Sequence, residues 1–288
     1  MIKQRIYQVE VDDQVIVSEV ATGSQARIHF DVTIDALGHV TLCDLNLSNL
    51  SEGTINAVFK RGAVLSLRAG YNDSSDYIFT GIIRNVFRYR EGATTITQIL
   101  ARGGDLEKSI INKSLGKNAL LSEIIQSISD SMGYSLVINK SEFSEKYITG
   151  YSMTGDPLTY LDNLSSAHDF NWTINGNKLI VFKVASGISQ SLRKINMLAG
   201  LEGIPEVTEV GVDFNIRLTP SIKIGERVEV DTKYNSFNFS GVYYPTKLQD
   251  GAGDGEYTIM KIVHSGDNYG DLWTTKCTGY NSNYVVID

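Results

Sequence analysis

Hydrophobic and polar residues alternate over the first hundred positions with the period of β-strands. Two apolar segments flank Asp12-Asp13, a dipeptide that favours a turn. In ARIHFDVTIDA apolar and polar residues then alternate at every step, which is typical of a strand with one buried and one wet face. More short apolar segments follow, bounded by Gly, Asn and Asp, at 40–47, 64–67, 77–87 and 95–100. This spacing predicts a sandwich or a barrel for residues 1–108.

The hydrophobic period changes to that of helices in the middle of the chain. In NALLSEIIQSISDSMG apolar residues recur every four positions, and Gly133 is placed to end the helix in a left-handed cap. Asp156-Pro157 predicts the start of a second helix, because aspartate caps well and proline fits the first turn. The segment FNWTINGNKLIVF predicts a hairpin with a type I′ turn at Asn175-Gly176. Residues 109–184 are therefore expected to form a small α/β domain.

The β-strand alternation returns after residue 185, in GVDFNIRL and again in RVEV. A connection rich in Asn, Ser, Gly and aromatic residues spans 232–256, and loops of that length are usually functional or mobile. The segments EYTIMKIVHSGD and DLWTTKCTGY then predict a terminal hairpin. The expected fold is mainly β with a small α/β insert. Two related barrel-like β domains, at 1–108 and 185–288, flank the helix-containing domain, and the second carries the long loop.

The two predicted β domains share a short internal repeat. KRGAVLSLRAGY and KIGERVEVDTKY align without a gap, so that Gly62 matches Gly225 and Tyr71 matches Tyr234. A loop and a hairpin follow each tyrosine. Duplication of a β domain explains this match, and a chance match between two β segments is the alternative.

Composition and charge exclude several classes of function. With 42% hydrophobic and 20% charged residues, the chain can bury a globular core. The formal net charge of −7 argues against stable nucleic-acid binding, although not against a pore through which DNA passes. We expect no membrane insertion, because no apolar run is long enough to span a bilayer, and the charged N-terminus does not resemble a secretion signal. Cys43 and Cys277 are too far apart in the chain to form a disulfide framework or a zinc motif.

One stretch near the C-terminus, HSGDNYGDLWTTKCTGY, gathers His264, Asp267, Asp271 and Cys277. These residue types would suit nucleophilic catalysis or a metal site. Nothing in the sequence orients or activates a Cys–His pair, however, and Cys277 suits a small strand residue. The acidic segment at 250–256 also falls short of a calcium loop, because the full ligand set and the closing glutamate are missing. We therefore interpret the stretch as the end of a sheet and predict no catalytic residue, metal or cofactor.

Several motifs resemble those of a known family. Four of them have the order found in the first domain of the tail hub proteins of contractile-tailed bacteriophages, the late control protein D-like hubs: Asn49-Leu50-Ser51, Gly62, Ala69-Gly70-Tyr71 and Phe79-Thr80-Gly81-Ile82. The C-terminal part is similar through LEGIPEVTEVGVDFNIRLTPSIKIGERVEV and IVHSGDNYGDLWTTKCTGY. Each motif is short, but their order extends over nearly the whole chain.

The resemblance implies a structural, non-enzymatic baseplate hub of the virion tail, assembled in the bacterial host cytoplasm. Such hubs are homotrimers, in which two barrel-like domains per chain form a six-lobed ring. The ring joins the sixfold tail tube protein to the threefold central spike protein and contacts baseplate wedge or tape measure proteins. The alternatives are the hub of a phage-like contractile bacteriocin or injection machine, a tail-associated cell-wall hydrolase, and an OB-like module that binds oligosaccharide or single strands.

Six aromatic residues are candidate interface residues: Phe237, Phe239, Tyr243, Tyr244, Tyr71 and Trp273. The first four lie in the long loop, which interrupts the second β domain where the first has only residues 72–76. Exposed aromatic residues are costly as idle surface, so we expect them either to pack on their own domain or to dock on a partner. Because the loop breaks the equivalence of the two β domains, we expect it to contact a threefold partner or a neighbouring hub subunit.

Overall fold

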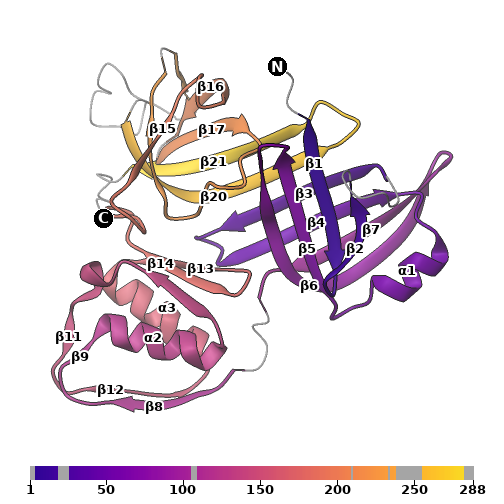
Figure 1. The fold of residues 1–288 in the computed structure, drawn as a ribbon. Helices are drawn as coiled ribbons and strands as arrows, with labels where there is room; N and C mark the ends of the chain where they lie inside the picture. The colour runs from indigo at the N-terminus through magenta and orange to yellow at the C-terminus, as the bar shows by residue number, and fades with distance from the viewer. Residues whose placement is uncertain are drawn as a thin grey trace.

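The computed structural model describes residues 4–18, 26–104, 109–208, 210–232, 234–237 and 255–281. The first part of the chain is built of strands with one short helix (Figure 1): β1 (Arg5–Val11), β2 (Gln14–Ser18), β3 (Ile28–Asp35), β4 (Val40–Ser48), α1 (Glu52–Val58), β5 (Val64–Tyr71), β6 (Ser74–Glu91) and β7 (Thr94–Arg102). Buried and half-buried residues alternate along the whole of β3, as the sequence predicts. Asp12 and Asp13 form the turn between β1 and β2, both with positive φ.

The middle of the chain is the helix-containing part, drawn at the lower left of Figure 1. Its elements are β8 (Ile111–Leu115), β9 (Ala119–Leu120), α2 (Leu121–Met132), β10 (Ser135–Ile138), the 3₁₀ helix η1 (Lys140–Phe143), β11 (Lys146–Tyr147), β12 (Tyr151–Gly155), α3 (Pro157–His168), β13 (Asn171–Asn175) and β14 (Lys178–Phe182). A cluster of buried apolar residues between 111 and 181 forms a core for this part.

The last part returns to β structure. Its elements are β15 (Leu192–Ile195), β16 (Leu201–Val207), β17 (Gly211–Arg217), β18 (Arg227–Val230), β19 (Ser236–Phe237), β20 (Gly255–Asp267) and β21 (Trp273–Asn281). Its buried residues belong to the same core as those of the first part. Most of the long loop that the sequence predicts, at 238–254, lies outside the described residues.

A single 14-stranded sheet runs through both β parts. Its order is β19-β16-β17-β21-β20-β3-β4-β7-β6-β5-β1-β2; off this path β18 pairs with β20, and β15 pairs with β18. The second half of β20 joins the two parts, because it pairs with β3 in antiparallel orientation. The pairing runs from Lys261 opposite Asp35 to Asp267 opposite His29. The prediction of a mainly β fold is thus confirmed. The predicted barrels are not confirmed, because the described strands form an open sheet and do not close on themselves.

The strand order repeats within this sheet. The antiparallel series β3-β4-β7-β6-β5 has the same order and chain sequence as β16-β17-β21-β20-β18. Matching hydrogen bonds mark the same position in both: Gly62 N–H donates to Ile83 O (2.9 Å), and Gly225 N–H donates to Ile259 O (2.8 Å). Both glycines have positive φ, where glycine is least strained, and a register shift follows both isoleucines. The match between Gly62 and Gly225 in the sequence therefore reflects equivalent backbone geometry.

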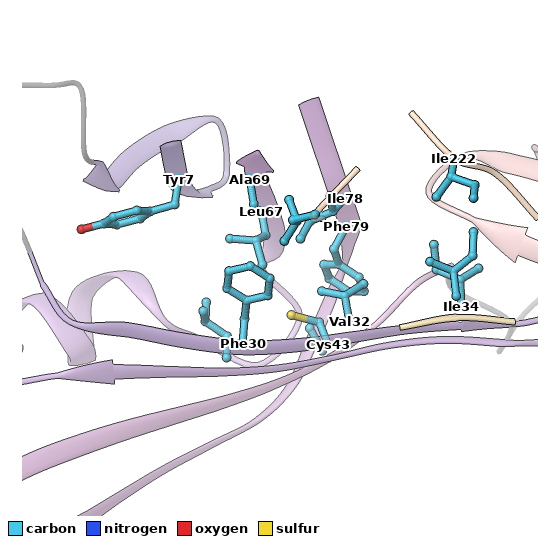
Figure 2. Packing of buried hydrophobic residues seen from close by; sticks show 14 of the residues in the cluster. Tyr7, Phe30, Val32, Ile34, Cys43, Leu67, Ala69, Ile78, Phe79 and Ile222 are labelled. Carbon is cyan, nitrogen blue, oxygen red and sulfur yellow. The ribbon is translucent and has the colours of Figure 1, made fainter. Parts of the chain in front are cut away.

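Phe30 fills the core where the two repeats meet. In the pairing of β3 with β20 it lies opposite Gly266, and its ring makes an edge-to-face contact with Trp273, with centroids 5.4 Å apart. A Cβ on Gly266 would lie 2.4 Å from Phe30 Cζ, so only glycine leaves room for the ring. Figure 2 shows Phe30 beside Leu67 and Val32 in this core. Residues from both repeats are thus packed together at the seam.

Polar contacts attach the helix-containing part to the sheet at the turn between β3 and β4. The His39 ring stacks on Trp172, with centroids 4.0 Å apart, and its Nδ1 donates to Trp172 O at 2.6 Å. The Thr41 hydroxyl donates to Ile174 O at 2.7 Å. These bonds satisfy the outer carbonyl groups of β13, which would otherwise be buried without partners.

Local signals in the sequence give most element ends correctly. Gly133 ends α2 with φ of 76°, and the Asp156 side chain caps α3 by accepting Leu158 N–H. The hairpin turn lies one residue later than predicted. Asn175 pairs with Lys178, so Gly176 and Asn177 form the turn, and of these two only Gly176 has positive φ. Helix α1 is not among the predicted elements, although the Ser51 hydroxyl caps it by accepting Thr54 N–H at 3.1 Å.

Candidate functional site

The terminal hairpin of β20 and β21 holds the residues that most resemble a reaction centre. His264 lies opposite Thr275, and Cys277 lies opposite Ile262. His264 is 1% exposed, and its Nδ1 is 2.8 Å from Thr275 Oγ1, which accepts Thr219 N–H at 3.0 Å. The histidine is therefore held by a threonine hydroxyl and has no hydrogen bond to the cysteine.

Burial keeps both residues in their uncharged forms. It lowers the pKa of His264 to about 4 and raises the pKa of the Cys277 thiol far above its ordinary value. A nucleophilic cysteine needs a lowered pKa and access to substrate, and Cys277 is fully buried. His264 and Cys277 both lie in the core, without the mutual hydrogen bond, the lowered thiol pKa or the access to substrate that a catalytic dyad needs.

The two aspartates of the hairpin shape its turn. Asp267 accepts hydrogen bonds from Tyr269 N–H (2.9 Å), Gly270 N–H (3.1 Å) and the Arg27 guanidinium (2.7 Å). Burial alone would raise the pKa of Asp267, but these hydrogen bonds lower it. Asp271 contributes a backbone carbonyl that accepts from Arg5 at 3.0 Å. Both residues thus fix the loop between β20 and β21.

The part of the chain that the structure describes holds no candidate metal cluster. No group of three or more His, Cys, Asp or Glu side chains there is arranged to hold a metal ion. His168 Nε2 is 2.7 Å from the Tyr147 hydroxyl, and His29 lies 3.4 Å from Asp31. Among the helices of the described part, none is both long and apolar enough to cross a bilayer.

The burial of His264 predicts a specific pH dependence of stability. The pKa is about 4 in the folded chain and 6.5 in the unfolded chain, so between these values only the unfolded chain binds the proton. The free energy of unfolding should therefore fall as the pH is lowered from 6.5 to 4, by on the order of 3 kcal/mol from this group. His264→Gln should show a correspondingly smaller fall in urea titrations at several pH values. His29→Gln, with a partly exposed side chain, is the control, and equal pH dependence in all three proteins would contradict the prediction.

The predicted interface residues have different positions. Trp273 is 2% exposed, and its indole N–H donates to Gly70 O at 3.1 Å, so it belongs to the core and is no longer an interface candidate. Tyr71 is half-buried at the end of β5, and burial raises its pKa. The backbone of Phe237 lies in β19. Its side chain and the other candidates, Phe239, Tyr243 and Tyr244, lie outside the described residues.

Exposed apolar residues gather at two edges that the sequence did not single out. On β6, Phe87 and Tyr89 are 49% and 45% exposed. Beside β16, the exposed fractions are 83% for Met197, 94% for Leu198 and 60% for Ile204. Tyr234, 73% exposed, precedes β19, which pairs with β16. Sequence alternation did not reveal the residues on strands, because it predicts which face of a strand is wet but not which edge lacks a neighbour.

The charges of these two edges are opposite. The segment of β6 beyond Ile82 carries Arg84, Arg88, Arg90 and Glu91, and Arg88 forms an ion pair with Glu52 of α1. Among the described strands this segment pairs only with β7. Strand β16 carries Glu202 and Glu206. Unpaired strand edges with exposed apolar residues are typical of surfaces that bind another chain. The fold thus defines a mainly β protein whose exposed strand edges are candidate contact surfaces.

The matching family model assigns the chain more narrowly. The model of the baseplate hub gp41 family matches residues 41–249, which is more than half of the chain. The protein belongs to this family and is a structural protein of the phage tail baseplate. No curated protein sequence matches the chain significantly.

Three solved structures have a similar fold, and two of them are tail proteins. The 43 kDa tail protein of prophage MuSo2 from Shewanella oneidensis has a TM-score of 0.62 at 10% identity, over 97% of this chain and 99% of its own. A tail protein of Neisseria meningitidis MC58 has a TM-score of 0.59 at 9% identity, over 96% and 97%. The third is an Escherichia coli component of the type VI secretion system, described as similar to the tail proteins gp27 and gp5 of bacteriophage T4. It has a TM-score of 0.52 at 8% identity, over 97% of this chain and 77% of its own. At these identities the likeness shows the fold.

Proposed function

We propose that the protein is the non-enzymatic hub of a contractile tail, a homotrimer whose six β repeats form a ring with pseudo-sixfold symmetry. The ring would adapt a sixfold tail tube protein to a threefold central spike protein, with baseplate wedge or tape measure proteins as further partners. The same part would serve the hub of a contractile bacteriocin or injection machine. We further propose the three domains 1–108, 109–184 and 185–288. A cell-wall hydrolase is the less favoured function, because the buried, uncharged His264 and Cys277 suit no catalysis.

One observation carries this proposal: the two repeats have the same strand order, but only one of two equivalent edges is paired within the chain. Because Ile83 and Ile259 are equivalent, residues 85–91 of β6 correspond to residues 261–267 of β20. The β20 segment pairs with β3 of the first repeat. The β6 segment has no such neighbour among the described strands. The equivalent of β3 is β16, which lies at the opposite side of the sheet.

A second copy of the chain would supply the missing neighbour. The β6 edge of one copy would meet the edge formed by β16 and β19 of the next, and this junction would repeat the one already present between β20 and β3. Such a head-to-tail contact closes into a ring if the rotation is suitable, and three two-repeat chains give six related junctions, three within chains and three between them. Strand β19 occupies part of this edge, so the junctions between chains would differ from those within a chain. Threefold symmetry would follow from this difference.

The copy number in the intact tail tests the proposal. We expect three copies at the hub by electron microscopy, and six copies or one copy would contradict it. Cross-linking tests the junction: Tyr89→Cys combined with Ile204→Cys should give disulfide-linked oligomers in assembled tails. The native cysteines will not compete, because both are buried. Tyr89→Cys combined with Ile148→Cys, at an exposed site of the helix-containing part, is the control and should remain unlinked.

A further inference from the structure

A cavity of about 500 Å³ lies where the three parts of the chain meet. The start of β6 forms one wall, the β13–β14 hairpin forms another, and residues 220–223 with His264 form the third. Five isoleucines line it, and all but the half-buried Ile188 are nearly fully buried: Ile34, Ile78, Ile180 and Ile222. In Figure 2, Ile222 points toward Ile34 from the opposite side of the core. The volume is within the range of sites that hold a small ligand, and domain junctions are common places for such sites.

His264 is the buried polar group of this cavity. Thr275 Oγ1 accepts Thr219 N–H, so the Thr275 hydroxyl proton is available to His264 Nδ1 at 2.8 Å. In the tautomer in which Nδ1 accepts this proton, Nε2 carries the ring proton and has no hydrogen-bond partner among the described residues. Because the ring is uncharged and buried, it offers a neutral N–H donor. A ligand that reaches it therefore needs an oxygen acceptor next to an apolar group.

The mouth of the cavity favours an anion. Lys178 and Lys223 are exposed at the rim, where Asp76 supplies one opposing charge. Neither lysine forms an ion pair within the described part of the chain. The net charge of these three groups is positive, which complements a carboxylate. The cavity thus combines an apolar interior, one neutral donor and a cationic mouth.

We propose that this cavity binds the C-terminal residue of a partner polypeptide, with a large apolar side chain inside and its carboxylate between Lys178 and Lys223. The backbone carbonyl of that residue or its neighbour accepts from His264 Nε2. The choice of a polypeptide over a free carboxylate rests on the proposed function, because a hub is surrounded by protein partners. The site itself does not depend on ring formation.

Calorimetric titration of the full chain with short peptides tests this site. Acetyl-Ala-Phe with a free carboxylate should bind, and acetyl-Ala-Phe-amide should bind at least tenfold more weakly. Lys178→Glu combined with Lys223→Glu should reduce binding of the acid at least tenfold without lowering the melting temperature. Lys113→Glu combined with Lys140→Glu, two lysines at a different surface, is the charge-matched control and should bind as the unmodified chain does.

Several outcomes would overturn the inference. Equal binding of acid and amide would remove the role of the carboxylate, and unchanged binding by the Lys178→Glu, Lys223→Glu chain would place the peptide elsewhere. Failure of the acid to bind at millimolar concentration would also contradict it. Phenylacetate that binds as tightly as the peptide would indicate a small-molecule site instead of a polypeptide site. Because all titrations use the unassembled chain, a wrong trimer proposal would leave these results unchanged.

Discussion

Phe30→Ala is expected to lower the free energy of unfolding by about 3–5 kcal/mol, which is the usual cost of deleting a buried aromatic ring. Phe30 is 0% exposed and occupies the seam between β3 and β20. The substitution removes the edge-to-face contact with Trp273 and leaves a cavity over Gly266. Both repeats lose packing at once, because their residues share one core.

Urea unfolding with linear extrapolation measures this loss. Phe87→Ala is the matched control, since it deletes the same ring from a site that is 49% exposed. It should cost the isolated chain less than about 1 kcal/mol. A loss below 1 kcal/mol for Phe30→Ala would show that the seam contributes little and that the two repeats are held together elsewhere.

Phe87→Ser combined with Tyr89→Ser should abolish incorporation of the hub into tails while the isolated chain remains folded. If these rings lie in the proposed junction, each is an aromatic anchor at an interface, and removing such an anchor typically costs about 2 kcal/mol or more. Each 1.4 kcal/mol corresponds to a tenfold change in affinity, and the junction occurs three times in the proposed ring. Small losses per site therefore become a large loss of assembly.

Complementation of hub-deficient phage, with quantification of hub protein in purified tails, measures the effect. Ile148→Ser is the control, because Ile148 is 75% exposed but lies in the helix-containing part, away from both sheet edges. Normal incorporation of the doubly substituted chain, with its melting temperature unchanged, would exclude the β6 edge as the junction. Loss of incorporation together with a much lower melting temperature would indicate misfolding. The test of the junction would then be the cross-linking of Tyr89→Cys with Ile204→Cys.

The predictions that succeeded depended on short-range chemistry. A capping aspartate before proline, a glycine in left-handed conformation and strict alternation each act over a few residues, so Asp156, Gly133 and β3 could be assigned from the sequence. The resemblance to tail hub proteins also rested on local motifs in their order, and the family match confirms it. The absence of an activated Cys277 remains a prediction, although burial raises the pKa of its thiol.

The displaced hairpin turn and helix α1 show where local sequence signals fail to predict the structure. One residue of register separates a turn centred on Asn175-Gly176 from the one that forms, and pairing of the flanking strands decides it. The seven residues of α1 bury only Ile55 on the helix itself. A helix that short depends on packing more than on propensity, so its apolar pattern is too brief to detect.

Periodicity and local motifs were enough to predict the mainly β fold, helices α2 and α3 and the resemblance to tail hub proteins. They did not predict helix α1, and they left the internal repeat open to chance. The pairing of strands, in contrast, is visible only in the folded chain. The tertiary structure places β20 against β3, buries Trp273, and leaves Phe87 and Ile204 at opposite edges. The physical reason is that alternation specifies the face of a strand, whereas an edge is defined by the strand that does or does not lie beside it. That neighbour is supplied by segments more than two hundred residues away in the chain.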